Sequence, residues 1–374
     1  MRILLWQELF WPHIGGIEIL STKLLCALRE RGHEVVVVTR RDSPDLPCQS
    51  EYQGIPVYRY PFPWTAFADG NLDQLLETRQ QVARLKRSFR PDLVHMNSLG
   101  PSSFFHQITG NAHATPLLVT LHTTLQSILP MGALRQDGLF RKSLRMANWV
   151  ACVSAAVLAE ARQLAPEINP CSSVIYNGLE VINLAPKLAH VDPPQLLCLG
   201  RLVPDKGVDL AIAAFAAISD RFPKLRLIIA GDGPARLSLE KQAAALAIAG
   251  SVDFVGWVPP EKVEELINLA TIVVMPSHRE GLPTVALEAA LMARPVVGTQ
   301  VGGFPEVVLH QKTGWLVPPG DENALAEALL LLLNEPRSAV EMGEAARIRA
   351  QEIFSFERYI DAYENLYCRL VTGA

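Results

Sequence analysis

The chain has 374 residues, of which 49% are hydrophobic and 19% are charged, and its formal net charge is -4. This length suits two domains of about 150 to 200 residues better than a single core. The composition excludes a disordered protein, and the acidic balance argues against nucleic-acid binding through bulk positive charge. No apolar run in the sequence approaches the ~20 residues that a membrane-spanning helix needs.

The first half of the chain alternates short β-branched runs with helical patterns. The predicted strands are Ile3–Trp6, Val35–Thr39, Leu93–Asn97, Leu117–His122 and Val150–Ser154, and the predicted helices include Ile17–Arg31, Leu72–Phe89 and Ala155–Leu164. Near-continuous apolar strands that alternate with helices indicate a parallel sheet covered on both faces.

The alternation pauses between Asn183 and Pro194, where three prolines interrupt it, and we place the domain linker there. It resumes with the predicted strands Leu196–Gly200, Leu225–Gly231, Val252–Gly256, Ile272–Pro276, Pro295–Gly298 and Trp315–Val317. The prediction is an α/β protein of two Rossmann-like, doubly wound domains, 1–185 and 186–354. Ligands of such sheets bind at the carboxyl ends of the strands, so two facing domains imply a cleft between them.

The six cysteines contain no Cys-x-x-Cys pair, and most lie in apolar runs. They indicate reduced thiols in a cytoplasmic protein, not a disulfide framework or a zinc site. The segment from Gly231 to Arg236 resembles a dinucleotide-binding fingerprint, but Arg236 stands where the third glycine belongs. We therefore do not interpret it as a nicotinamide cofactor site.

The most informative segment runs from Ser277 to Glu288 and follows the predicted strand at Ile272. Pro283 and Thr284 favour a helix start, and a helix N-terminus at a strand's carboxyl end suits phosphate. Glu280 precedes this helix and Glu288 lies about one turn inside it. Carboxylates accept hydrogen bonds from sugar hydroxyls, although two isolated glutamates are more often surface and capping residues.

Three further segments lie at strand ends. The turn from Leu199 to Gly207 carries Arg201 and Lys206, which can clamp a diphosphate, although the same pattern also suits a solvated turn. The paired glycines Gly15 and Gly16 follow the first strand and permit close backbone approach to a ligand. His122 ends an apolar strand, a position at which a lone histidine is usually structural.

Together these segments resemble glycosyltransferase family 4, retaining enzymes of the GT-B fold. The resemblance covers nearly the whole chain and rests on the order and spacing of many elements. They are the early GGxE loop, strand-end His122, Tyr176–Glu180, LGRLVPDKG, IAGDGP, FVGWVP, the two glutamates at 280 and 288, and Pro295–Glu306. The terminal segment 355–374 resembles the family's last helix, which crosses back to the N-terminal domain.

The resemblance implies a role for each of these residues. Arg201 and Lys206 would hold the donor diphosphate and stabilise the leaving group, with backbone amides of Gly15 and Gly16 on the same phosphates. Glu288 would bind the ribose hydroxyls. The remaining contacts would be to the transferred sugar, through Glu280, His122 and the amides of Gly281 and Leu282, and to the base, through the backbone of Trp257 and Val258.

Three departures from the family pattern bear on this reading. Ala293 stands where a glycine is usual before the Pro-Val-Val strand, and Thr123 stands where an aspartate is frequent after the histidine. The resemblance assigns residues 1–185 to the acceptor and 186–354 to the nucleotide-sugar donor. The acceptor domain carries few motif residues, so the resemblance does not transfer an acceptor. No Asp-x-Asp pair and no Cys/His cluster is present, so no metal is expected to assist the transfer.

Two alternatives share the donor-site chemistry: another GT-B enzyme such as a nucleotide-sugar epimerase, and a non-catalytic nucleotide-sugar-binding protein. A peripheral membrane contact through the N-terminal domain is a further possibility. It rests on the aromatic loop Tyr60–Phe67 and on two basic stretches, which also suit solvated helix faces. These stretches are Arg79, Arg84, Lys86, Arg87 and Arg90, and Arg135, Arg141, Lys142 and Arg145.

Overall fold

The computed structural model describes residues 1–374 except 14, 63–71, 126–137, 181–184, 187–191 and 374. The chain forms two compact units, one of Met1–Tyr176 with Tyr359–Ala374 and one of Asn177–Arg358. Much of the linker predicted between Asn183 and Pro194 lies outside the described residues. Each unit has its own sheet and its own buried core.

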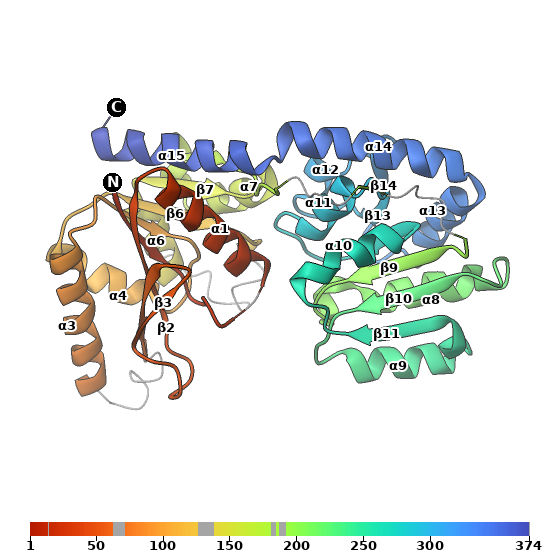
Figure 1. Ribbon diagram of the computed structural model, residues 1–374, viewed down its shortest axis with the longest axis horizontal. Coiled ribbons are helices and arrows are strands. Elements are labelled where there is room, and N and C mark those ends of the chain that lie inside the picture. The colour runs from red at the N-terminus through yellow and green to blue at the C-terminus, as the bar shows by residue number, and fades with distance from the viewer. Residues whose placement is uncertain (14, 63–71, 126–137, 181–184, 187–191, 374) are drawn as a thin grey trace. The chain divides into compact units, whose positions relative to one another are not determined.

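The first unit is built on an eight-stranded sheet with the order β3-β4-β2-β1-β5-β6-β7-β8 (Figure 1). Its neighbouring strands are parallel except for the antiparallel pair β3 and β4. The strands are β1 (Arg2–Trp6), β2 (Glu34–Arg40), β3 (Gln49–Tyr52), β4 (Ile55–Tyr60), β5 (Leu93–Met96), β6 (Leu117–Leu121), β7 (Trp149–Cys152) and β8 (Ser172–Val174).

Helices cover both faces of this sheet. They are α1 (Gly16–Glu30), α3 (Leu72–Phe89), α4 (Ser103–Ile108), α6 (Leu139–Met146), α7 (Ala155–Leu164) and α15 (Phe356–Thr372). Alternate residues of a strand face the same side, so β5 shows which helices share a face. His95 contacts Tyr367 of α15, and Asn97, two residues further along the chain, contacts Ser21 of α1. Helices α1 and α15 therefore cover the same face of the sheet.

The antiparallel edge of the sheet is a feature that the sequence pattern did not predict. Gln53 and Gly54 join β3 to β4, and both have positive φ, 51° and 75°. Two positive φ values characterise the type I′ turn of a two-residue hairpin. The expectation of an entirely parallel first sheet is therefore wrong at this edge.

The second unit has a six-stranded parallel sheet with the order β11-β10-β9-β12-β13-β14. Its strands are β9 (Gln195–Leu199), β10 (Arg226–Ala230), β11 (Val252–Gly256), β12 (Ile272–Met275), β13 (Val296–Thr299) and β14 (Gly314–Val317). Its helices are α8 (Val208–Ser219), α9 (Arg236–Ala245), α10 (Pro260–Leu269), α11 (Thr284–Leu291), α12 (Phe304–Val307), α13 (Glu322–Asn334) and α14 (Pro336–Ile353).

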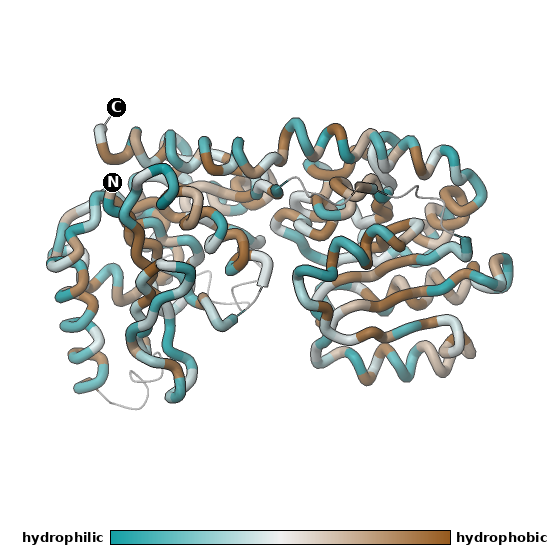
Figure 2. Tube along the Cα trace, in the orientation of Figure 1, coloured by the Kyte–Doolittle hydropathy of each residue, from teal (hydrophilic) through white to brown (hydrophobic). Residues whose placement is uncertain are grey.

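One large buried cluster of the second unit lies between its sheet and helices α8, α9 and α13. Phe215 and Ile212 of α8 and Leu329 of α13 are fully buried there, against strand residues such as Leu227 and Ile272. Figure 2 shows the matching pattern, with hydrophobic colour along β9 and β10 and mixed colour along the helices. The predicted class, two doubly wound α/β units, is confirmed, and the ends of the predicted strands differ from the observed ones by at most two residues.

Candidate active site

The second sheet reverses its strand order between β9 and β12. From β9 the chain proceeds to β10 and β11 on one side, and β12 leads to β13 and β14 on the other. In open α/β sheets ligands bind at the carboxyl ends of the strands at such a point. The loop after β9 carries Arg201 and Lys206, and the loop after β12 carries Glu280, so the predicted residues of both loops lie at this edge.

The loop after β9 has a fixed shape. Pro204–Lys206 form a single 3-10 turn, and Gly207 follows with a φ of +61° before α8 begins. A Cβ at Gly207 would lie 2.1 Å from the carbonyl oxygen of Pro276, so no larger residue fits. The amide of His278 donates to the carbonyl of Asp205 over 2.8 Å. These contacts hold the two loops against each other.

A short chain of polar contacts joins the two loops. Lys206 Nζ lies 2.5 Å from Glu280 Oε1, and the Ser277 hydroxyl donates to the same oxygen over 2.8 Å. The hydroxyl of Thr299, at the end of β13, donates to the carbonyl of Ser277. Ser277 is 1% exposed, and the Glu280 side chain 9%. The carboxylate is thus held through Oε1, and no described residue pairs with Oε2.

The backbone of Glu280 is fixed as well. A Cβ at Gly302 would lie 1.7 Å from the Glu280 carbonyl oxygen, and Gly302 has a φ of +50°, so this approach requires glycine. The Gly303 amide donates to the same carbonyl over 3.4 Å. Gly281 and Leu282, which follow, are buried. The loop before α11 is therefore packed from both sides.

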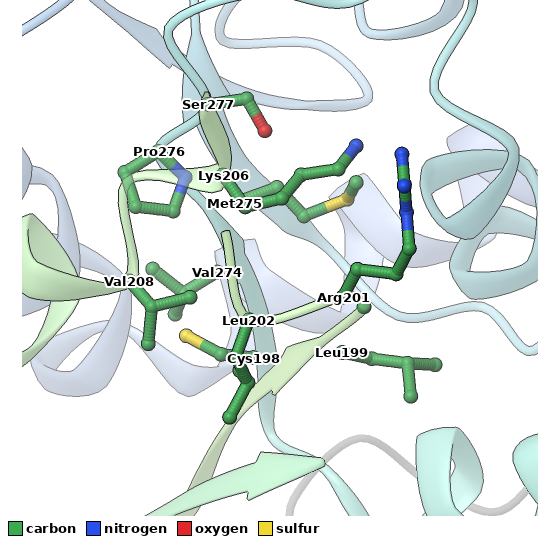
Figure 3. Close-up of a pocket in the computed structure, with 11 residues that line it drawn as sticks. Cys198, Leu199, Arg201, Leu202, Lys206, Val208, Val274, Met275, Pro276 and Ser277 are labelled. Carbon is green, nitrogen blue, oxygen red and sulfur yellow. The ribbon is translucent and has the colours of Figure 1, made fainter. Parts of the chain in front are cut away.

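A pocket lies beside the two cationic side chains. Arg201, Lys206 and Ser277 line it together with the apolar residues Leu202 and Val274. Figure 3 shows the Arg201 and Lys206 side chains extending to the same side of this pocket. Arg201 is exposed and Lys206 half-buried. The arrangement offers two positive charges and one carboxylate at a single edge of the sheet.

The other predicted residues of this unit lie on neighbouring elements. Glu288 is half-buried and lies about one turn inside α11, which begins at Thr284 as predicted. Trp257 and Val258 follow β11, and Trp257 is 61% exposed. An exposed indole at a strand's carboxyl end offers a flat apolar surface.

The first unit carries its predicted residues at the carboxyl ends of β1 and β6. Gly15 caps α1, which begins at Gly16, so both glycines lie at a helix N-terminus. His122 follows β6, and its Nε2 lies 2.9 Å from Asn97 Oδ1. Burial lowers the pKa of His122 to about 4. The imidazole is therefore neutral near pH 7.

Sequence reasoning missed three residues that fix these groups. Ser277 and Gly302 hold Glu280, and Asn97 holds His122. Gly302 lies within Pro295–Glu306, a segment that carries the family resemblance, but the sequence pattern alone gives it no role. Ser277 and Asn97 act through hydrogen bonds whose partners the sequence does not indicate.

The basic stretches proposed for membrane contact are only partly exposed. Lys86 is 2% exposed, with Nζ 3.2 Å from His106 Nδ1, and burial lowers its pKa to about 7. The expectation that Lys86 lies on an exposed basic face is therefore wrong. Arg141 and Arg145 both pair with Glu167. Arg135 and residues 63–67 of the aromatic loop lie outside the described residues.

The described part of the chain lacks two features, a membrane-spanning helix and a cluster of metal-ligating side chains. No helix there combines the length and the apolar character that crossing a bilayer requires. No group of three or more His, Cys, Asp or Glu side chains is placed there to hold a metal ion.

Comparisons with known proteins agree with the resemblance in the sequence. Residues 14–181 match Glycosyltransferase Family 4, and residues 182–349 match Glycosyl transferases group 1. Glycogen synthase of Mycobacterium tuberculosis is 29% identical over 408 residues, covering 100% of this chain and 96% of the relative.

Solved structures share the fold along the whole chain. Sucrose-phosphate synthase from Thermosynechococcus elongatus has a TM-score of 0.85 at 23% identity and covers 100% of both chains. Anabaena HepE in complex with UDP-glucose has a TM-score of 0.77 at 21% identity, covering 99% of this chain and 100% of the other. The chain therefore belongs to the family 4 glycosyltransferases, described also as glycosyl transferases group 1, and has their GT-B fold.

Proposed function

We propose that the chain is a retaining hexosyltransferase. It moves a hexose-type sugar from a nucleoside diphosphate sugar to a hydroxyl of a glycan, lipid-linked or small-molecule acceptor. The observation that supports this proposal most is the group of Arg201, Lys206 and Glu280 at the reversal point of the second sheet. Cations for a diphosphate and a carboxylate for sugar hydroxyls are what a nucleotide-sugar donor requires.

The proposed phosphate contacts are divided between two kinds of cation. Arg201 can donate to two phosphate oxygens at once, whereas Lys206 acts as a point charge. In the structure Lys206 pairs with Glu280, so part of its charge is already balanced. The bound diphosphate would share the ammonium group with Glu280 or take it over. The two cations would then neutralise the nucleoside diphosphate as it leaves.

The placement of the two glutamates supports the proposed contacts to the sugar and to the nucleoside. Glu280, with the amides of Gly281 and Leu282, would bind the hydroxyls of the transferred sugar. Glu288 would bind the ribose, and the backbone at Trp257 and Val258 would line the base. Glu280 Oε2 is the carboxylate oxygen proposed for the sugar, because Oε1 already accepts from two described residues.

In the first unit, Gly15 and Gly16 would offer amides to the phosphates, and His122 would contact the sugar near the reacting carbon. A helix N-terminus suits phosphate, and α1 begins at Gly16. A neutral imidazole also suits a sugar ring that becomes positively charged during transfer, since a charged one would oppose it.

The proposed transfer occurs on one face of the sugar. The bond from the anomeric carbon to the diphosphate oxygen breaks as the acceptor oxygen bonds to the same carbon. The acceptor's proton passes to the departing phosphate oxygen. No enzyme nucleophile is assigned, and we propose that no divalent metal takes part, because Arg201 and Lys206 balance the leaving group's charge.

The test is transfer from UDP-glucose and other nucleoside diphosphate hexoses to a panel of sugar acceptors, followed by NMR of the anomeric proton. UDP-glucose comes first because HepE, a structural neighbour, has been solved with it. We expect an α-linked product from an α-linked donor, formed at the same rate with excess EDTA. A β-linked product would exclude retention. Loss of the rate in EDTA with rescue by Mg²⁺ would exclude the metal-free mechanism, and an epimerised nucleotide sugar would exclude transfer.

A further inference from the structure

A buried polar network lies at the carboxyl ends of β1, β5 and β6. Gln7, Ser21 and Asn97 are each 1% exposed. Asn97 Nδ2 lies 2.8 Å from Ser21 Oγ and 3.1 Å from Gln7 Oε1. On its other side, Asn97 Oδ1 lies 2.9 Å from His122 Nε2. The network therefore joins three strand ends and helix α1 to the histidine proposed for the sugar.

The hydrogen bonds of Ser21 determine the orientation of the Asn97 amide. The Ser21 hydroxyl donates its single proton to the carbonyl of Ile17 over 2.6 Å. Ser21 Oγ can therefore only accept from Asn97, so the amide nitrogen must face Ser21 and the amide oxygen must face His122. A flipped amide would place Asn97 Oδ1 against Ser21 Oγ, which has no proton left to donate.

The amide orientation in turn determines the state of His122. An oxygen that faces Nε2 can only accept, so Nε2 carries the proton and Nδ1 carries the lone pair. Nδ1 is buried and has no hydrogen-bond partner among the residues that the structure describes. The pKa of about 4 keeps the ring neutral. The titratable group coupled to it is His95, whose pKa is lowered to about 3 by burial and, secondarily, by His122.

We propose that Asn97 is a positioning residue that holds His122 as the neutral Nε2–H tautomer, so that its Nδ1 lone pair accepts a hydroxyl of the donor sugar. The proposal rests on the proposed contact between His122 and that sugar. An unpaired buried acceptor costs free energy, and a bound hydroxyl restores the missing hydrogen bond. The opposite tautomer would present a donor at this position and could not accept from a hydroxyl.

Two substitutions of Asn97 distinguish the effect of the His122 tautomer from the effect of the His122 charge. Asn97→Ala leaves Nε2 with no acceptor, so the ring should populate both tautomers. Asn97→Asp places a negative charge beside Nε2, which favours the protonated imidazolium and raises the pKa of His122. Gln107→Ala is the matched control, because it removes another partly buried amide of this unit that donates to Ser143 Oγ and not to His122.

The experiment is long-range ¹H–¹⁵N NMR of the full-length protein with labelled histidines. His95 serves as an internal control, since its nitrogens contact Tyr367 and Thr120 instead. We expect protonated Nε2 for His122 in the wild type and in Gln107→Ala, and a tautomer mixture in Asn97→Ala. A proton on Nδ1 in the wild type, or an unchanged tautomer in Asn97→Ala, would overturn the proposal.

Transfer kinetics test the part of the proposal that concerns catalysis. Asn97→Ala should lower kcat by about 10- to 100-fold through misplacement of the ring. The pH profile of Asn97→Asp should gain an acid limb at higher pH than the wild type, because protonation removes the acceptor. If the tautomer changes as expected while Asn97→Ala keeps the wild-type kcat, the positioning role is wrong. If His122→Ala also keeps wild-type transfer, the proposed function of His122 itself is wrong.

Discussion

Ser277 shows how one buried hydroxyl can prepare a carboxylate for a ligand. It shares Glu280 Oε1 with Lys206, and Oε2 is the oxygen that we propose for the sugar. We expect Ser277→Ala to lower kcat/KM for transfer. The loss of transition-state stabilisation should be about 1.5 to 3 kcal/mol, the range of a hydrogen bond to a charged group. Binding of the bare nucleoside diphosphate should change much less, because that ligand has no sugar to orient.

The matched control is Ser219→Ala, which removes a hydroxyl that donates to the carbonyl of Ala216 at the end of α8. It should leave both transfer and nucleotide binding unchanged. Equal loss of transfer and of nucleotide binding in Ser277→Ala would show that Ser277 supports the loop in general and does not orient Glu280 for the sugar.

Glu280 and Glu288 should differ in what their removal costs. Glu288→Ala should weaken calorimetric binding of UDP, since the proposed ribose contact does not require the sugar. Glu280→Ala should leave UDP binding nearly unchanged and reduce transfer by about 2 to 4 kcal/mol of transition-state stabilisation. The reverse pattern would exchange the two assignments.

At the level of single elements, the end of α11 explains the family departure at Ala293. Ala293 has a φ of +53°, and the Arg294 amide donates to the Ala289 carbonyl over 2.8 Å. This is the Schellman ending of a helix, in which glycine is preferred at the left-handed residue. The alanine keeps the same turn geometry at a conformational cost.

We therefore expect Ala293→Gly to raise the free energy of unfolding by up to about 1 kcal/mol. Glycine relieves the strain at this left-handed residue, and this gain exceeds the cost of the added entropy of the unfolded chain. Ala244→Gly, at an exposed position within α9, is the control and should destabilise by up to about 1 kcal/mol. Chemical denaturation measures both. Destabilisation of Ala293→Gly equal to that of the control would contradict the argument.

Elements with a regular apolar pattern could be predicted from the sequence, and the exceptions have physical reasons. The helix Leu72–Phe89 was predicted with its observed bounds. The hairpin of β3 and β4 was missed because β3 reads Gln-Ser-Glu-Tyr, β4 contains Pro56, and the turn is Gln-Gly, a weaker signal than Asn-Gly. The polar edge strand β3 lacks the run of buried residues that marked the predicted strands.

The site was predicted only as far as local motifs reach. Arg201 and Glu280 stand in recognisable segments at strand ends, whereas the Ser21–Asn97–His122 network joins residues 76 and 25 positions apart. Such contacts depend on the register of β1, β5 and β6, which no single segment encodes. Residues that orient others therefore became apparent only with the fold.

At the scale of the whole molecule, buried histidines should make stability depend on pH. Burial lowers the pKa of His95 to about 3 and that of His122 to about 4. The unfolded chain binds these protons near pH 6.5. The stabilisation that the two neutral histidines give the folded state is therefore complete above that pH and is lost as pH falls toward 4. Each histidine adds up to about 1.4 kcal/mol per pH unit to the slope of the free energy of unfolding against pH.

His95→Gln tests this, because glutamine can still donate and accept between Thr120 and Tyr367 but does not titrate. The free energy of unfolding of the variant should fall less steeply than that of the wild type between pH 6 and about 4.5. Parallel curves for the two proteins would show that His95 is not held neutral by burial.

The claim that Arg201 and Lys206 bind the donor diphosphate has the most direct test. The measurement is calorimetric titration of UDP, GDP and ADP into the wild type, Arg201→Ala, Lys206→Ala and the control Lys241→Ala, whose exposed side chain lies on α9. We predict that one diphosphate binds the wild type and the control equally, and each site variant about 10- to 150-fold more weakly. Absence of binding by all three nucleotides, or wild-type affinity in Arg201→Ala, would contradict the account.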